Sequence, residues 1–193
     1  MMKSLVLGAL LGGLVAFAWS FVSWMVLPWH NPGMISFGNE TAVARVLMDN
    51  ATTSGMYILP GVPAGYAKMQ GAEKKAAEEA MEQRAKTMPF FYGVVLRRAD
   101  FDMGKQMAVS VVFDILAALL VTMLVMRTGG MTYAGRVMFI VTVALAAAVM
   151  CVLPNWVWWH YPTTVVVVGM ADVVIAWLLA GLVIAKVAAP RAA

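Results

Sequence analysis

Four long apolar runs divide the chain into segments suited to lipid and segments suited to water. Apolar residues fill positions 5–27, 106–126, 137–153 and 163–185 almost without interruption. An α-helix rises about 1.5 Å per residue, so runs of this length can cross a hydrocarbon core of about 30 Å. The pattern predicts four transmembrane helices, with a short carboxyl-terminal tail at 186–193.

The first apolar run has a second interpretation as a secretory signal peptide. Lys3 precedes the run, and Ala16-Phe17-Ala18 resembles a cleavage site. The apolar stretch nevertheless continues through Trp24, well past that point. We therefore expect a retained first transmembrane helix within residues 1–27, ended by Pro28.

Most of the charge lies between the first two runs, at positions 28–105. Asn39 can cap a helix over 40–50, in which apolar residues recur on one face. Residues 71–87 alternate acidic and basic side chains at four-residue spacing, which favours a helix with a solvated surface. We expect this whole segment to lie outside the membrane.

The rest of the polar segment is poor in helical signals. Positions 55–65 are rich in Gly and Pro and indicate a loop. Positions 89–98 read as a strand, with which 55–59 could pair. The fold class expected overall is an all-α membrane protein of four transmembrane helices, with a small α(+β) extramembrane segment between the first two.

Composition agrees with lipid as the solvent. The chain is 62% hydrophobic and 12% charged, whereas soluble domains are about half apolar and about a quarter charged. The formal net charge of +4 is spread along the sequence and forms no nucleic-acid footprint. Cys151 is the single cysteine, which excludes an intramolecular disulfide. Membrane lipids are therefore the first partners expected.

The orientation follows from the charges on the short segments. Lys and Arg without acidic residues are typical of cytoplasmic loops. Such basic residues occupy the amino end, the turn between the second and third runs, and the tail: Lys3, Arg127, Arg136, Lys186 and Arg191. We expect both termini in the cytoplasm, although Arg97, Arg98 and Lys105 on the other side oppose this assignment.

Small residues recur every four positions in the first run, at Gly8, Gly12, Ala16 and Ser20. Such a stripe lets two helix backbones approach closely in lipid. It favours packing within the four-helix bundle, and the alternative is an interface with a second copy or a partner subunit.

Two carboxylates interrupt the apolar runs, Asp114 in the second and Asp172 in the fourth. At helical rise, both lie about 12–14 Å from the same end of the bundle, at the level of Ser20. Acids in lipid are costly, so each is expected to be protonated, hydrogen-bonded to Ser or Trp, or in contact with water or a cation. Structural hydrogen bonding between helices and a proton or cation site both remain open.

Both histidines stand beside tryptophan at the end of an apolar run, as Trp29-His30 and Trp159-His160. Imidazole can ligate a metal or haem, or hydrogen-bond a quinone. An amphipathic anchor at the outer membrane surface is the simpler interpretation. The repeat of the cluster on two helices is what favours a cofactor site.

Three stretches carry a family resemblance: FAWSFVSWMVLPWHN, GMYILPG and PFFYGVV. They resemble uncharacterised four-helix inner-membrane proteins of Gram-negative bacteria. The resemblance covers most of the chain and implies a location in the inner membrane, with the polar segment in the periplasm. It implies no activity.

The sequence contains no P-loop, GxGxxG, HExxH, GxSxG or CxxC motif, so a non-enzymatic role is favoured. We expect an accessory or structural subunit of a homo-oligomer or of a larger membrane complex. The first alternative is a protein that binds haem, a metal or a quinone through His30 and His160. The second is proton- or cation-coupled transport through Asp114 and Asp172.

Overall fold

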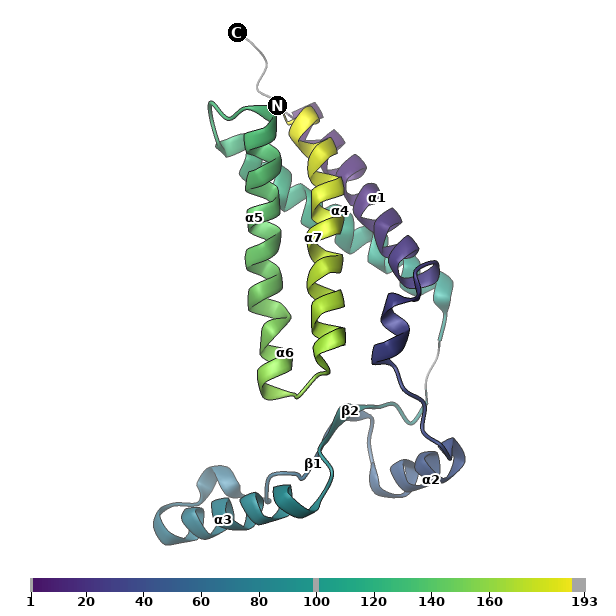
Figure 1. Cartoon of the computed structure of the whole chain (residues 1–193), viewed down its shortest axis with the longest axis vertical. Coiled ribbons are helices and arrows are strands. Elements are labelled where there is room, and N and C mark those ends of the chain that lie inside the picture. Colours follow the sequence, from purple (N-terminus) through teal and green to yellow (C-terminus); the bar gives the residue numbers. More distant parts are fainter. Residues whose placement is uncertain (1, 99–100, 189–193) are drawn as a thin grey trace. The chain divides into compact units, whose positions relative to one another are not determined.

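The computed structural model describes residues 2–98 and 101–188, and the chain divides into two compact units. The helical unit comprises the chain up to Ile35 and from Asp102 onward. The sheet unit comprises Ser36–Phe101. The long helices all belong to the first unit, and the short elements of the second include the only two strands within the described residues (Figure 1).

Four helices of the described residues are long and apolar enough to cross a membrane, with mean hydropathy between 2.2 and 2.6. This confirms the four apolar helices predicted from the sequence. They are α1 (Met2–Met25), α4 (Met103–Arg127), α5 (Tyr133–Cys151) with the short α6 (Leu153–Trp158), and α7 (Thr163–Val187).

Polar caps make two of these helices begin earlier than the apolar pattern suggested. The Asp102 carboxylate accepts a hydrogen bond from the backbone N–H of Lys105, and the Thr132 hydroxyl accepts one from the N–H of Gly135. A cap of this kind satisfies a backbone donor that the first turn of a helix leaves free. Helices α4 and α5 therefore start about one turn before the predicted spans at 106–126 and 137–153.

Helix α5 ends at Cys151, close to the predicted end at 153, and is followed shortly by Pro154. This proline occupies the first turn of α6, where the missing N–H of proline breaks no helical hydrogen bond. Trp156 and Trp158 consequently lie in α6 rather than in a loop. The connection to α7 shrinks to the few residues around His160, whose φ of 52° places it in the left-handed region.

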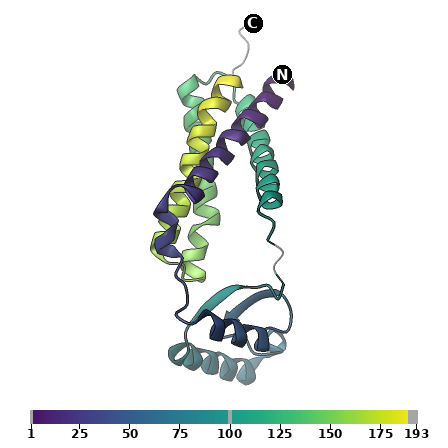
Figure 2. The ribbon, with the colours of Figure 1, turned by 90° about the vertical axis from the view of Figure 1, so that its right-hand side faces the viewer.

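Helix α1 packs against two partners, α4 and α7, while α5 packs mainly against α7 (Figures 1 and 2). The core between these helices is built largely of small side chains. Its fully buried members include Ala118 of α4, Ile140 of α5 and Ala180 of α7. Small residues allow close backbone approach, which is how helices gain dispersion energy where lipid supplies no hydrophobic drive.

The small-residue stripe of α1 is used inside this bundle. A Cβ on Gly8 would meet the Thr122 side chain at 2.6 Å, and one on Gly12 would meet Ile184 at 2.7 Å. Ala16 is buried in the same core. The stripe thus faces α4 and α7 of its own chain, as the interpretation of packing within the bundle had it.

Arg136 of α5 is buried despite its charge. Its guanidinium donates from Nε to the carbonyl of Ala185 at 2.9 Å and from a terminal nitrogen to the carbonyl of Met131 at 3.0 Å. The Tyr133 hydroxyl donates to the carbonyl of Leu182 at 3.0 Å. Cationic donors favour the carboxyl end of a helix, so these bonds hold the end of α7 against the start of α5.

The sheet unit contains α2 (Glu40–Asn50), β1 (Gly55–Leu59), the one-turn η2 (Tyr66–Lys68), α3 (Gly71–Thr87) and β2 (Phe91–Val95). Both helices match the predicted bounds. The strands pair antiparallel with Tyr57 opposite Gly93, which confirms the pairing expected for 55–59. The loop expected over 55–65 therefore begins only after β1.

Arg97, just after β2, connects this strand to the end of α2 by hydrogen bonds. Its guanidinium donates to the carbonyls of Met48 and Ala51 at the end of α2, and its backbone N–H donates to the Ser54 hydroxyl. A cation at this end of α2 opposes the negative end of the helix dipole. The charge that opposed the predicted orientation thus has a structural use within this unit.

Candidate functional site

The short helix η1 (Pro28–Gly33) brings the first histidine into the helical unit. Pro28 at its start fixes the backbone and ends α1, after which η1 packs against both α1 and α7. Gly33 permits this contact, because a Cβ there would collide with the Val165 side chain of α7. His30 is therefore largely buried against its own chain, with a side chain only 11% exposed.

Asp172 of α7 receives two partners from the first part of the chain. The Trp19 indole Nε1 donates to its Oδ1 at 2.6 Å. His30 Nε2 lies 3.5 Å from its Oδ2. A bond to Trp was one of the alternatives expected for this acid. The carboxylate side chain is 15% exposed, so the pair is largely shielded.

Ser23 completes the network around the imidazole. Its hydroxyl lies 2.9 Å from His30 Nε2 and accepts a hydrogen bond from Trp29 Nε1 at 3.0 Å. With Nε2 unprotonated, the Ser23 hydroxyl can donate to it. With Nε2 protonated, the same nitrogen can donate to Ser23 Oγ or toward Asp172. The cluster therefore accepts either protonation state of His30 without losing all of its hydrogen bonds.

Ser, His and Asp meet here, but not in the manner of a hydrolase triad. In a triad, the serine and the carboxylate contact different nitrogens of the imidazole, which takes the serine proton while the carboxylate orients the ring and stabilises its cation. In this cluster, Ser23 and Asp172 approach the same nitrogen, and Ser23 is completely buried. The arrangement is suited to holding a proton and not to activating a nucleophile.

Aromatic rings frame the imidazole on two sides. The Trp24 ring stacks on His30 with centroids 3.8 Å apart and planes 10° apart. Trp29 meets His30 edge to face at 5.8 Å and Trp19 edge to face at 5.9 Å. Offset-stacked and edge-to-face contacts are the favoured geometries of such rings, so the position of His30 is well defined.

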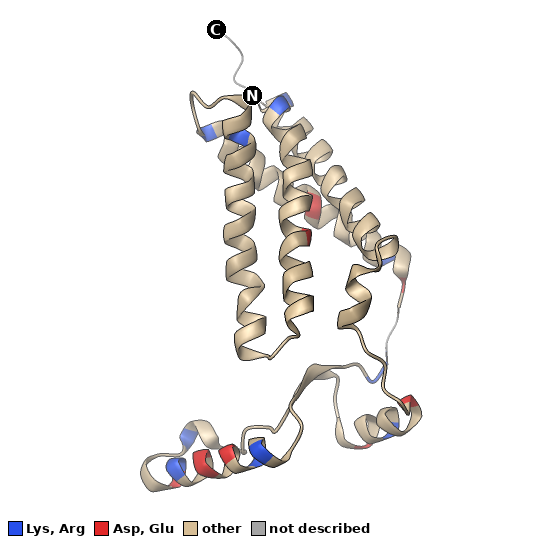
Figure 3. Cartoon of the chain, in the orientation of Figure 1, with Lys and Arg blue, Asp and Glu red and all other residues tan. Residues whose placement is uncertain are grey.

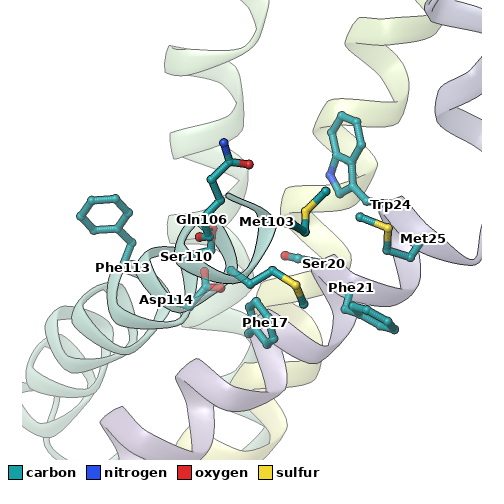
Figure 4. A pocket seen from close by; sticks show the side chains of 11 residues that line it. Phe17, Ser20, Phe21, Trp24, Met25, Met103, Gln106, Ser110, Phe113 and Asp114 are labelled. Carbon is teal, nitrogen blue, oxygen red and sulfur yellow. The ribbon is translucent and has the colours of Figure 1, made fainter. Parts of the chain in front are cut away.

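Asp114 of α4 lies in a different setting, an open groove of about 440 Å³ between α1 and α4 (Figure 4). Two close contacts bring the helices together before the groove, at Gly8 with Thr122 and at Gly13 with Ile115. Beyond them the two helices separate toward the end of α1 (Figure 2). Asp114 has no hydrogen bond or ion pair among the described residues.

The two acids share a level but not a site. Asp172 meets α1 at Trp19, whereas Asp114 lines the groove together with the next residue, Ser20. Two acidic positions lie midway along helices of this unit, while its Lys and Arg, like the capping Asp102, lie at the helix ends (Figure 3). The polar layer expected at the depth of Ser20 is therefore present, but it is divided between two flanks of α1.

The second histidine does not repeat the arrangement of the first. His160 is exposed and follows Trp159 in the connection that leads into α7. Asp172, which contacts His30, lies nine residues inside α7, or about 14 Å along its axis. Within the described residues, no group of three or more His, Cys, Asp or Glu side chains could hold a metal ion. His30 also lines a small pocket with Thr164 and Val165 in the first turn of α7, and a cofactor held by His30 and His160 together stays a prediction.

Sequence reasoning missed Trp19 and Ser23 as members of the site. The signal was present, because Gly12, Ala16, Trp19 and Ser23 follow the three- and four-residue spacing of one helix face. The small members of this stripe were recognised. The polar members beyond them were not connected to it.

The chain matches no protein-family model, no curated protein and no solved structure. Its own geometry must therefore support any proposed function.

Proposed function

We propose that this chain is a multi-pass protein of a bacterial inner membrane, with both termini in the cytoplasm. We further propose that it takes part in proton-coupled transport through the His30–Asp172 pair. Four helices of sufficient length and hydropathy support the membrane location. Basic residues at the start of α1 and at the ends of α4 and α7 support the cytoplasmic placement of both termini. These residues are Lys3, Arg127 and Lys186. On this assignment, the sheet unit lies in the periplasm.

The observation that carries the proton-coupled function is the contact between His30 Nε2 and Asp172 Oδ2 at 3.5 Å within apolar helices. An ionisable pair inside a membrane span is costly, and such pairs mark proton and ion pathways. Imidazole is the side chain that ordinarily changes charge between about pH 5 and 8. The pair is largely shielded by its own chain, with the imidazole 11% and the carboxylate 15% exposed.

Proton flux into liposomes tests this function. The purified protein is reconstituted with a pH-sensitive dye inside the vesicles, and the external pH is lowered while potassium and valinomycin clamp the voltage. We expect faster internal acidification than in protein-free liposomes. The variants Asp172→Asn and His30→Gln should fall to the protein-free rate, while Glu79→Gln on the exposed face of α3 should keep the wild-type rate. Equal rates in wild-type and empty liposomes would contradict the proposal.

A role as an accessory subunit is the second candidate, supported by the free face of α4. Three large apolar residues, Val112, Leu116 and Leu120, form a four-residue stripe on α4 and are each more than half exposed. Lipid or a partner helix can cover such a stripe. Mass measurement of the protein in mild detergent tests the idea: a homo-oligomer or a co-purifying subunit is expected, and a strictly monomeric particle would oppose it.

A further inference from the structure

The groove between α1 and α4 is a second site, separate from the His30 cluster. Its volume of about 440 Å³ falls within the usual range of small-molecule sites, about 300–1,000 Å³. A groove of this size suits a compact molecule better than it suits a whole helix. Both walls belong to the helical unit, so the site does not depend on the sheet unit.

The α4 wall is polar along one line. Gln106, Ser110 and Asp114 follow four-residue spacing and all line the groove, with Ser20 across from them on α1 (Figure 4). Asp114 is the one ionisable residue in this lining. The described residues provide it with no cationic partner. A carboxylate in an apolar setting gains free energy when a cation binds beside it.

The α1 wall is aromatic. Phe17, Phe21 and Trp24 line it at three- and four-residue spacing. Aromatic faces attract cations through the ring quadrupole, and this attraction increases where water is excluded. The same rings also accommodate an apolar body. The wall therefore favours a cation whose charge is attached to hydrocarbon rather than a strongly hydrated metal ion.

Methionine side chains form the rest of the rim, namely Met25, Met103 and Met107. Thioether side chains are flexible and polarisable and adapt to ligands of different shape. Together with the aromatic wall and the lone carboxylate, they define a chemical class of ligand.

We propose that the α1–α4 groove binds a lipophilic organic cation, such as a protonated hydrophobic amine or a quaternary onium ion. The cationic centre lies at Asp114, and the apolar body contacts Phe17, Phe21 and Trp24. The site includes neither His30 nor Asp172, so a failure of ligand binding and a failure of the proton function are distinguishable outcomes.

Equilibrium binding of radiolabelled tetraphenylphosphonium to the full chain in phosphatidylcholine nanodiscs tests the proposal, with empty nanodiscs as the background. We expect saturable binding that weakens at least tenfold in Asp114→Asn. Asp49→Asn makes the same change of charge on exposed α2 and should bind as wild type. Tetraphenylborate, which has the same shape and the opposite charge, should not compete.

A second variant keeps the test valid if Asp114→Asn were to fold poorly. Ser110→Trp fills the groove from the exposed side of α4 and should also abolish binding, with circular dichroism and gel filtration confirming the fold. The proposal would be overturned by wild-type affinity in Asp114→Asn, by wild-type affinity in Ser110→Trp, or by equal binding of tetraphenylborate. Absence of saturable binding to the wild-type protein would also overturn it.

Discussion

Asp172 and Asp114 face one helix from two sides, and their surroundings differ in every respect that matters. Asp172 has an indole donor and an imidazole within reach, and the partners are themselves fixed by aromatic stacking. Asp114 has a groove, adaptable methionine side chains and no described partner. Asp172 thus belongs to a hydrogen-bonded network within the chain, whereas Asp114 lines a groove and has no described partner.

The difference shows what stabilises an acid in an apolar helix. A carboxylate that is hydrogen-bonded within its own chain contributes to the fold, and its removal leaves unpaired donors behind. A carboxylate without such partners contributes little to the fold and remains available to a ligand. Stability measurements on matched variants can therefore separate the two roles.

The largest effect is expected at Gly13, where α1 and α4 touch. A Cβ there would lie 2.5 Å from Ile115 Cα, which is backbone and cannot rotate away. Gly13→Ala should cost about 3 kcal/mol of unfolding free energy because the helices must move apart. Reversible unfolding in mixed micelles measures it, with Gly129→Ala, which meets nothing within 4 Å, as the control. Equal stability of the two variants would contradict the close approach on which the groove depends.

The next largest effect is a difference in unfolding free energy between variants of the two acids. Asp172→Ala removes the acceptor of Trp19 and the partner of His30 and should cost about 2 kcal/mol. Asp114→Ala breaks no described bond and should stay within about 0.5 kcal/mol of wild type. The same unfolding assay compares the two directly. Similar losses at both positions would remove the distinction drawn between a closed and an open site.

Trp24 contributes to both sites, the His30 cluster and the α1–α4 groove. Its ring stacks on His30 and also lines the groove. Trp24→Leu should cost about 1 kcal/mol of stability through the lost stack. It should also weaken binding of tetraphenylphosphonium several-fold. Trp158→Leu on α6, where the ring is 71% exposed, serves as the matched control. A variant that changed only one of the two readouts would assign Trp24 to a single site.

The smallest expected effect is a change in the pKa of Tyr66 when Glu78 on the exposed helix α3 is replaced. Glu78 on α3 accepts a hydrogen bond from the Tyr66 hydroxyl at 2.8 Å, and this bond raises the pKa of Tyr66 above its usual value of about 10. The bond stabilises the fold below that value and is lost as the pH rises through the raised pKa. Glu78→Gln should therefore lower the pKa of Tyr66. Ring-carbon NMR measures it, with Glu79→Gln as the control, and an unchanged titration would show that the bond does not form in solution.

The helices followed from the sequence because each depends on local information. Apolar run length set the four long helices, and Asn39 together with charge spacing set α2 and α3. The misplaced details came from contacts between distant residues. The third span was predicted to end at 153, and the helix α6 that resumes there with Pro154 in its first turn was not predicted.

The candidate site was less predictable for the same reason. Asp172, Asp114 and His30 were recognised individually from their chemistry. Their assignment to separate sites depends on the rotation of α1 between its two neighbours and on the reversal of the chain in η1. Helical spacing marks one face of α1 but does not say which neighbouring helix that face contacts, and the reversal in η1 leaves no periodic signal. The resemblance of the two Trp-His pairs suggested a symmetry that the fold does not have.

The Trp24 indole lies between the α1–α4 groove and the His30 imidazole. Trp24 cannot shift toward the groove without uncovering one face of His30, and a guest that pressed on the indole from the groove would press it against the imidazole. Occupancy on one flank of α1 and protonation on the other would then be sensed through a single side chain. Trp24 is one of seven tryptophans, so its fluorescence would record both events in a variant that keeps this tryptophan alone.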